Sequence, residues 1–283
     1  MAAVTIGLLH PGAMGTAVGA TLRAGGARVV WASAGRTAAT RARAASAGFE
    51  DLGALEAVVA ASDVIVSVCP PDAALDVAAG VAAHGFRGVY VDANAIAPAT
   101  ARAVGRAVEA GGATFVDGGI IGPAPARPGS TRLYLAGKDA ARVSARFAAG
   151  PIEAIELDGP AGAASALKMA YAAWTKGSAA LLLAVRALAR AEDAEPALLA
   201  EWARSQPDLA ERSEKAAGRN AAKAWRFVGE MDEIAATFAA DGLPDGFHRA
   251  AAEVYRRMEG YKDARTPPTA AEVAAVLVAR RAR

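Results

Sequence analysis

Hydrophobic residues in the first part of the chain alternate between short continuous runs and helical spacing. The run Val4–Leu9 is apolar and stops at Pro11-Gly12. Apolar residues from Ala13 to Arg23 then recur on one helix face, and Gly25-Gly26 ends the segment. A short apolar run bounded by turn residues is typical of a buried strand, and the spacing that follows it is typical of an amphipathic helix. The chain therefore opens with a predicted strand, a turn and a helix.

The same alternation continues along the first half of the chain. Strands that alternate with helices of about ten residues need right-handed crossovers and form a parallel sheet. We therefore predict an α/β domain with a doubly wound parallel sheet of the Rossmann type. We expect the Gly/Pro-rich segment Gly118–Gly129 to be a loop that lines a site. The further predicted strands are 27–32, 63–68, 88–92, 115–116 and 133–136, and the further predicted helices are 38–47 and 99–110.

The pattern changes after Asp158-Gly159-Pro160. From Ala163 to about Ala191 there is no proline and little glycine, which predicts one helix of about 28 residues that links two domains. Proline and glycine divide the remainder into helical segments. We predict a nucleotide-binding domain over residues 1–160 and an all-α domain over residues 161–283. The further helical segments are 197–204, 208–217, 222–240, 246–260 and 269–281.

Composition and charge narrow the class of protein. Hydrophobic residues make up 54% of the chain and charged residues 21%, which is typical of a globular protein. The formal net charge is +2, and no basic run carries interleaved aromatic residues, so we expect no nucleic-acid partner. We interpret Arg280, Arg281 and Arg283 as an ordinary charged chain end rather than an interaction tag.

Cysteine and histidine usage limits the chemistry. Cys69 is the only cysteine, which excludes an intrachain disulfide and a cysteine-cluster metal site and fits a reducing cytoplasm. His84 and His248 show no metal-ligand spacing, so we predict no metal. Met1–Leu9 lacks the charged start of a signal peptide, and no stretch reaches the roughly 18 apolar residues that span a bilayer. We expect a soluble, unexported protein that does not bind membranes.

The first turn carries the spacing of a dinucleotide-binding site. Gly12 and Gly15 occupy the second and third places of a G-x-G-x-x-G turn directly after the first strand. Gly12 allows backbone amides to approach a pyrophosphate, Gly15 allows the helix to pack on the strand, and the helix start at Ala13 and Met14 faces the anion. His10 stands at the first glycine, and we expect its ring to lie at the mouth of the crevice without a chemical role.

The residues after the second strand indicate which nicotinamide nucleotide binds. An NAD site places Asp or Glu about 20 residues after the glycine turn to hold the ribose 2′-hydroxyl. No acidic residue occurs between Gly12 and Glu50, and Ser33, Arg36 and Thr37 stand there instead. A hydroxyl and guanidinium set holds a 2′-phosphate, which a carboxylate would repel. We therefore predict NADP as the cofactor.

The strand that ends at Val68 should present its last residues to the cofactor. The carboxyl ends of parallel strands form the crevice that binds a dinucleotide, so we expect Cys69 and Pro70 to lie beside the nicotinamide ribose. Cys69 has neither a base nor a cation nearby in the sequence that would make it a nucleophile. We interpret it as a packing residue with no part in catalysis.

Five segments of the chain follow one another in a recognisable order and spacing. They are Gly7 to Gly15, Asp92 to Pro98, Asp117 to Pro123, Gly159 to Lys168 and Glu230 to Pro244. In that order they resemble the motifs G-x-x-G-x-G-x-M-G, D-x-S-T-x-x-P, D-A-P-V-S-G-G, G-x-x-G-x-G-x-x-x-K and K-D-L-x-L-A with its following turn, which belong to the β-hydroxyacid dehydrogenase and 6-phosphogluconate dehydrogenase superfamily. The resemblance spans nearly the whole chain, and the departures from the motifs are similar to a divergent, phosphogluconate-dehydrogenase-like branch.

The resemblance implies that Lys168 is the general acid/base at the carbinol oxygen. Partial desolvation at the start of a long apolar helix would ease proton exchange near neutral pH. The K-x-x-N-N motif of the family reads Lys168 to Ala172 here, so the substrate-holding amide is absent. Tyr171, Thr175 or Lys176 could replace it, because the first two share a helix face with Lys168. Asn94 stands where the family often has serine and is expected to bind substrate or the nicotinamide carboxamide.

The implied substrate loop has lost polar groups. It comprises Gly119, Ile120, Ile121 and Gly122, with Ile121 where the family has serine. Met231 takes the place of the acid in the K-D pair and is expected near the substrate. A site without these polar groups should bind a small carboxylate less well than 3-hydroxyisobutyrate dehydrogenases do.

We therefore expect an NADP(H)-dependent dehydrogenase or reductase that transfers a hydride between the cofactor and a carbonyl/alcohol substrate. One alternative is an NADPH-dependent imine reductase, since these enzymes share the architecture, although they frequently replace the lysine. Another is a protein that binds NADPH without turnover, suggested by the lost Asn, Ser and Asp. The resemblance also implies a homodimer formed through the helical domain.

Overall fold

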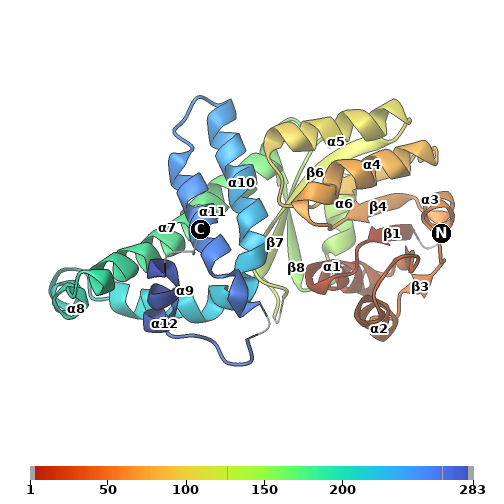
Figure 1. The fold of residues 1–283 in the computed structure, drawn as a ribbon. Helices are drawn as coiled ribbons and strands as arrows, with labels where there is room; N and C mark the ends of the chain where they lie inside the picture. Colours follow the sequence, from red (N-terminus) through yellow and green to blue (C-terminus); the bar gives the residue numbers. More distant parts are fainter. Residues whose placement is uncertain (1–3, 126, 263, 280–283) are drawn as a thin grey trace. The chain divides into compact units, whose positions relative to one another are not determined.

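The computed structural model describes residues 4–125, 127–262 and 264–279 (Figure 1). The basic chain end, Arg280, Arg281 and Arg283, lies outside the described residues. Within them, no helix combines the length and the apolarity that a bilayer crossing requires.

One eight-stranded sheet organises the N-terminal part of the chain, with the strand order β3-β2-β1-β4-β5-β6-β7-β8. Neighbouring strands are parallel except β6 and β7, which are antiparallel. The prediction of a doubly wound Rossmann domain is confirmed. The strands are β1 (Thr5–Leu9), β2 (Arg28–Trp31), β3 (Glu50–Asp51), β4 (Val64–Ser67), β5 (Val89–Asp92), β6 (Thr114–Ile121), β7 (Thr131–Ala136) and β8 (Ile152–Leu157).

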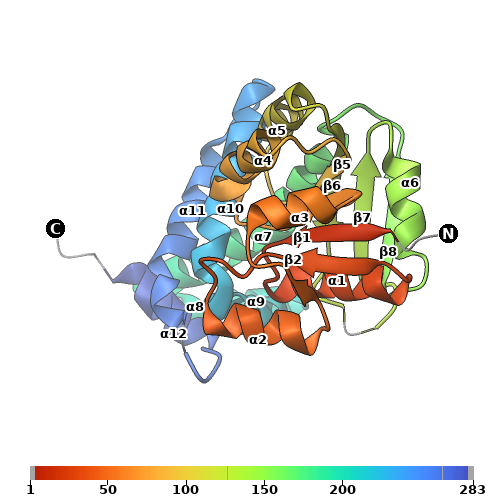
Figure 2. The same cartoon turned by 90° about the vertical axis from the view of Figure 1, so that its right-hand side faces the viewer.

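Helices cover both faces of this sheet, and each face has its own apolar core (Figures 1 and 2). Alternate residues of a strand point to opposite faces, so Val64 and Ile65 contribute to different cores. One core includes α1, α2 and α6, and the other includes α3, α4 and α5. The helices are α1 (Ala13–Ala24), α2 (Ala38–Ser46), α3 (Leu55–Ala61), α4 (Ala74–Ala83), α5 (Pro98–Ala110) and α6 (Ala140–Ser144), with 3₁₀ turns η1 (Pro71–Ala73) and η2 (Ala145–Phe147).

The sequence predicted a loop over Gly118–Gly129, but part of this segment is a strand. Its first four residues continue β6 and pair with β7 from Gly118 to Ile121. Two consecutive glycines suggest a loop, but here they are required by close packing on both sides. A Cβ on Gly118 would lie 2.7 Å from the Asp92 carbonyl oxygen, and one on Gly119 would lie 2.5 Å from the Ala164 carbonyl oxygen.

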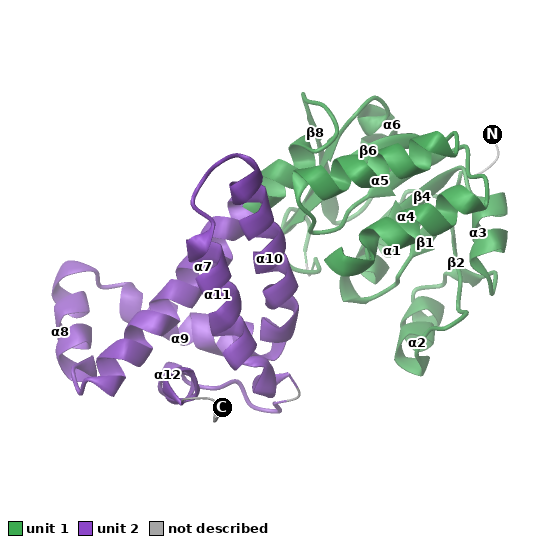
Figure 3. Cartoon of the chain, turned by 45° about the horizontal axis from the view of Figure 1, so that its top comes forward, with its two compact units in different colours: residues 1–169 green, residues 170–283 purple. Residues whose placement is uncertain are grey.

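The chain divides into two compact units, Met1–Met169 and Ala170–Arg283 (Figure 3). The division lies inside one long helix, α7, whose first turns belong to the first unit. The second unit is all helical, as predicted. Its elements are the remainder of α7 (Ala163–Ala191), α8 (Glu195–Ser205), α9 (Leu209–Asn220), α10 (Ala224–Ala240), α11 (Gly246–Arg257) and α12 (Ala270–Val278), with 3₁₀ turns η3 (Ala221–Lys223) and η4 (Glu259–Tyr261).

A buried arginine connects four helices of the second unit. The guanidinium of Arg186 on α7 donates to Glu195 of α8, at 2.6 and 3.0 Å, and to Ser213 and Glu214 of α9. The other carboxylate oxygen of Glu214 accepts from the backbone N–H of Ala270 in α12 at 2.9 Å. The charge is thus fully paired, which is the condition under which a buried arginine is tolerated.

Candidate active site

The glycine turn between β1 and α1 is shaped to receive an anion. Gly12 is the N-cap of α1 and brings no side-chain cap to the helix. A Cβ on Gly12 would meet nothing nearer than the His10 carbonyl oxygen at 4.0 Å, whereas a Cβ on Gly15 would collide with that same oxygen. Gly15 is therefore needed for packing, and Gly12 leaves the helix start open. The N–H groups of this first turn, from Ala13 and Met14, fit the pyrophosphate of a dinucleotide.

His10 has a backbone conformation that suits glycine, with a φ of 64°. Its carbonyl oxygen accepts from the Gly12 N–H at 2.7 Å and closes the turn. Burial, and then the charge of Arg36, lower the pKa of the imidazole to about 4. The ring is therefore neutral at neutral pH.

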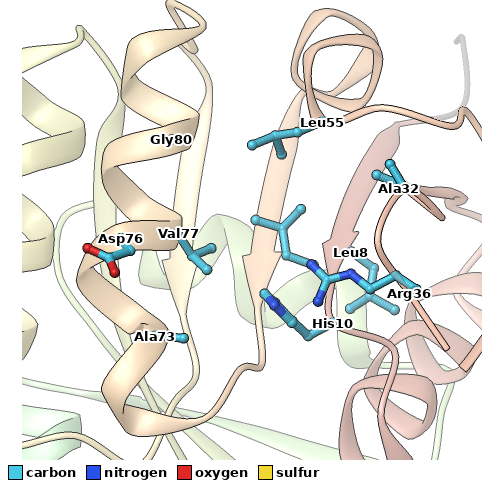
Figure 4. A pocket seen from close by; sticks show the side chains of 11 residues that line it. Leu8, His10, Ala32, Arg36, Leu55, Ala73, Asp76, Val77 and Gly80 are labelled. Atoms are coloured by element: carbon cyan, nitrogen blue, oxygen red, sulfur yellow. The ribbon is translucent and has the colours of Figure 1, made fainter.

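A pocket of about 330 Å³ opens beside this turn (Figure 4). His10 and Arg36 point into it, and its other walls are mainly apolar. Its size lies near the lower end of the range for small-molecule sites, roughly 300–1,000 Å³. The lining residues are Leu8, Leu9, His10, Ala32, Ala34, Arg36, Leu55, Ala73, Asp76, Val77 and Gly80.

The residues predicted to hold a 2′-phosphate follow β2, and Ser33, Arg36 and Thr37 all take part in hydrogen bonds within the protein. Thr37 caps α2 by accepting from the Thr40 N–H at 3.3 Å. Ser33 donates its N–H to the Asp51 carboxylate at 3.2 Å. Sequence reasoning missed Asp51, because it reaches Ser33 only through the parallel pairing of Trp31 with Asp51 in β2 and β3.

A hydrogen-bonded network joins the ends of β4 and β5. The Asn94 side chain accepts from the Cys69 N–H at 2.6 Å and donates to the Asp92 carboxylate at 2.7 Å and to Ser67 at 3.4 Å. Asn94 is buried, and three of its four side-chain hydrogen-bonding positions are used in this way. The geometry therefore assigns Asn94 to fixing the two strand ends, and it does not fit the prediction that its amide binds substrate or nicotinamide.

Cys69 and Pro70 differ in exposure although they are adjacent. Cys69 is buried, and burial raises the pKa of its thiol to about 11, so it remains a neutral packing residue. Pro70 is exposed just before η1, at the carboxyl end of the sheet where a cofactor contact is predicted.

Lys168 lies on a helix whose start is capped by Asp117, a carboxylate to which the sequence analysis assigned no role. Asp117 of β6 accepts from the N–H groups of Gly162 and Ser165, at 2.9 and 3.0 Å, and from the Ser165 hydroxyl at 2.6 Å. It therefore caps the start of α7 from outside the helix. One turn later, Lys168 donates from Nζ to the Ile120 carbonyl oxygen at 2.8 Å.

The electrostatics of Asp117 fit this role. Burial raises the pKa of its carboxyl group, and the hydrogen bonds from Ser165 and Gly162 oppose that rise. A negative charge at a helix N-terminus is also favoured by the helix dipole. The signal in the sequence was Asp117, directly after the predicted strand 115–116, followed later by a glycine-rich helix start.

The predicted substrate loop makes its contacts through backbone. The side chains of Ile120 and Ile121 are buried, and Ile120 belongs to an apolar core. They do not fit the prediction that they bind substrate, although the Ile120 carbonyl oxygen orients Lys168. Gly119 allows close approach of α7, and Gly122 has a φ of 119° and abuts Ser130.

Three predicted site residues lie in the second unit. Tyr171 is exposed, and Thr175 donates its hydroxyl to the Tyr171 carbonyl oxygen at 3.1 Å. Met231 is fully buried on the core face of α10 and does not fit the prediction of a substrate contact. Its neighbour Glu230 forms an ion pair with Lys176, at 2.5 Å.

No group of three or more histidine, cysteine, aspartate or glutamate residues in the described part of the chain is arranged to hold a metal ion.

Two family models match the chain. Residues 5–147 match the NAD binding domain of 6-phosphogluconate dehydrogenase. Residues 189–258 match a domain of unknown function, DUF1932. A curated relative, an uncharacterized 28.5 kDa protein in the 7S RNA 5′ region of Methanothermus fervidus, is 32% identical over 156 residues. That match covers 55% of this chain and 59% of the relative, so it spans about three fifths of the relative's length.

Solved structures share the fold over nearly the whole chain. A conserved hypothetical protein from Sinorhizobium meliloti 1021 is 26% identical, with a TM-score of 0.72 over 98% of this chain and 96% of that one. The conserved protein MTH1747, described as structurally similar to 3-hydroxyacid dehydrogenases, is 26% identical, with a TM-score of 0.68 over 92% and 100%. A 3-hydroxyisobutyrate dehydrogenase of Mycobacterium tuberculosis is 18% identical and shows the shared fold, with a TM-score of 0.72 over 98% and 100%.

The strand-end network predicts how stability depends on pH. Burial raises the pKa of Asp92 to about 7, while the hydrogen bonds from Asn94 oppose the rise. An unfolded aspartate titrates near pH 3.9, so between about pH 4 and 7 the folded protein binds this proton more tightly than the unfolded chain. We therefore expect Asp92 to lower the free energy of unfolding as the pH rises through this range, by up to about 1.4 kcal/mol per pH unit. Urea unfolding at several pH values measures the slope.

Asp92→Asn should remove that part of the slope, whereas Asp158→Asn, at an exposed aspartate, should leave the slope unchanged. An Asp92→Asn variant with the wild-type pH dependence would contradict the assignment.

Proposed function

Because the chain belongs to the 6-phosphogluconate dehydrogenase-like β-hydroxyacid dehydrogenases, we propose that it is an NADP(H)-dependent oxidoreductase that acts on a carbonyl/alcohol substrate. The observation that carries the proposal is the position of Lys168. Its ammonium group is fixed on the Ile120 carbonyl oxygen, on a helix whose start is capped by the buried carboxylate of Asp117. An amine positioned this way suits proton exchange with a substrate oxygen.

The nicotinamide ring, when bound, would supply or accept the hydride. Lys168 would donate a proton to the carbonyl oxygen during reduction and take it back from the alcohol during oxidation, so that hydride and proton together convert one into the other. Gly12, Ala13, Met14 and Gly15 would hold the pyrophosphate at the start of α1. Tyr171 and Thr175 remain predicted substrate contacts.

The 2′-phosphate of NADP would be held after β2. Arg36 follows β2 and lines the pocket, with Ser33 and Thr37 near it in the sequence. Asp51 is a carboxylate in the same neighbourhood, but it accepts from the N–H groups of Ser33 and Gly53. A carboxylate committed to these donors orients the turn and is less available to a ribose hydroxyl. We therefore retain NADP as the proposed cofactor, in a protein proposed to be cytoplasmic, with no nucleic-acid or membrane partner.

Lys168→Ala should reduce turnover of a carbonyl substrate by about 10²–10⁴-fold, the range for loss of a general acid/base. The measurement follows NADPH absorbance with panels of β-keto acids, aldehydes and cyclic imines. The affinity for NADPH, measured by fluorescence titration, should stay within about threefold of wild type, because Lys168 is not part of the glycine turn. Lys138→Ala is the control for loss of a lysine elsewhere.

The same panel separates the alternatives. Carbonyl activity that survives Lys168→Ala unchanged would exclude the lysine as acid/base. Turnover of cyclic imines alone would indicate an imine reductase. Tight NADPH binding without turnover of any substrate class would indicate a binding protein.

Arg36→Ala should weaken NADPH binding by about tenfold or more and leave NADH binding nearly unchanged, since a charge-assisted contact to phosphate contributes about 1.5–3 kcal/mol. Fluorescence titration of both nucleotides measures the ratio. Arg142→Ala, at an exposed arginine of α6, is the matched control. Wild-type protein that binds NADH tightly and NADPH weakly would overturn the choice of cofactor.

We also propose a homodimer formed through α7. Trp174, Leu181 and Leu188 recur at intervals of seven residues on this helix and are exposed to 69%, 64% and 66%. Residues seven apart lie on nearly the same helix face, so they form one apolar stripe. A stripe of this kind on two identical helices is self-complementary, which is the requirement of a two-fold interface.

Leu181→Glu should convert the dimer into a monomer, because it places a charge in the centre of the stripe. Sedimentation equilibrium measures the mass in solution. Leu243→Glu is the matched control, since Leu243 is also exposed in the second unit but lies off the stripe. A monomeric wild-type protein, or a dimer that survives Leu181→Glu, would contradict the proposal.

A further inference from the structure

His10 carries two costs that a glycine would not have. The first is its left-handed backbone, which among the described non-glycine residues is shared only by Asp193. A side chain in this conformation is disfavoured because its Cβ comes too close to the following carbonyl oxygen. Glycine is the usual residue at this place of the turn because it adopts the conformation freely. Strained residues of this kind occur where function requires the side chain.

The second cost lies in the imidazole ring. Its Nδ1 atom is buried and has no hydrogen-bond partner among the described residues. A buried polar atom left without a partner is costly, and a neutral imidazole can both donate and accept one hydrogen bond. The ring lines the pocket together with Arg36, which lies beside it (Figure 4).

We propose that His10 is a cofactor-binding residue whose imidazole hydrogen-bonds to the adenosine half of the dinucleotide. The inference rests on the proposed function and extends it to a residue that the glycine-turn motif does not include. It replaces our expectation from the sequence that His10 has no chemical role.

The place of the pocket identifies the adenosine half as the part concerned. Its walls come from the residues after β2 (Ala32, Ala34 and Arg36) and from α4. In a dinucleotide-binding sheet the end of β2 faces the adenosine ribose, and the apolar walls suit a planar purine. Arg36 is the flexible group beside His10, and its movement toward a ribose phosphate would open the imidazole to the ligand.

The test compares stability with affinity in the same variants. 2′,5′-ADP and ADP represent the adenosine half, and their binding is measured by calorimetry together with the melting temperature of each protein. His10→Gly should melt about 2–4 °C higher, since both costs are removed. It should bind the preferred probe about tenfold more weakly, as expected for one lost hydrogen bond.

Two further variants separate the side chain from the backbone. His10→Asn, which tolerates the left-handed conformation and keeps a polar group, should bind with intermediate affinity. Asp193→Gly relieves the same kind of strain in the other unit and should raise the melting temperature without any change in affinity. His10→Gly with an affinity within twofold of wild type would overturn the inference while leaving the proposed function intact. Wild-type protein that binds neither probe nor NADPH would overturn both.

Discussion

The geometry of the candidate active site depends on the buried carboxylate of Asp117. This carboxylate, on β6, accepts hydrogen bonds from the N–H groups of Gly162 and Ser165 and from the Ser165 hydroxyl. The start of α7 is therefore fixed to β6. Lys168 follows one turn later and meets the Ile120 carbonyl oxygen on the same strand. Gly119 allows the approach, because any side chain there would press on the Ala164 carbonyl oxygen. Strand β6 thus provides the helix cap (Asp117), the space for α7 (Gly119) and the carbonyl oxygen that binds Lys168 (Ile120).

Polar groups at the carboxyl ends of the strands serve two purposes. Ser67, Asp92 and Asp117 are register partners across β4, β5 and β6, so they lie in a row on one face of the sheet. Asp92 and Asn94 satisfy each other and fix the loop after β5. The glycine turn, in contrast, leaves the first N–H groups of α1 free of any side-chain cap. The donors of Asn94 have partners within the protein and hold the site in shape. The N–H groups at the start of α1 have no side-chain cap and are available to a ligand.

Local patterns were sufficient to predict the Rossmann sheet, the long helix and the glycine turn, because each depends on residues close together in the chain. The acid/base role of Lys168 stays a prediction that the family resemblance implies. The failures have non-local causes. Asp51 reaches Ser33 through strand pairing, and Asn94 is committed to strand ends 25 residues apart in the sequence. Gly118-Gly119 looked like a loop because the chain segments that crowd them lie far away in the sequence. Met231 followed a family position, whereas its helix face places it in the core.

The division of the chain inside α7 has a consequence for how such proteins diversify. The glycine turn, the pocket and the hydrogen bond from Lys168 to the Ile120 carbonyl oxygen lie within residues up to 169. Substitutions after this point leave these features in place, so the helical half can change without altering the glycine turn. The two halves also match separate family models, over residues 5–147 and residues 189–258.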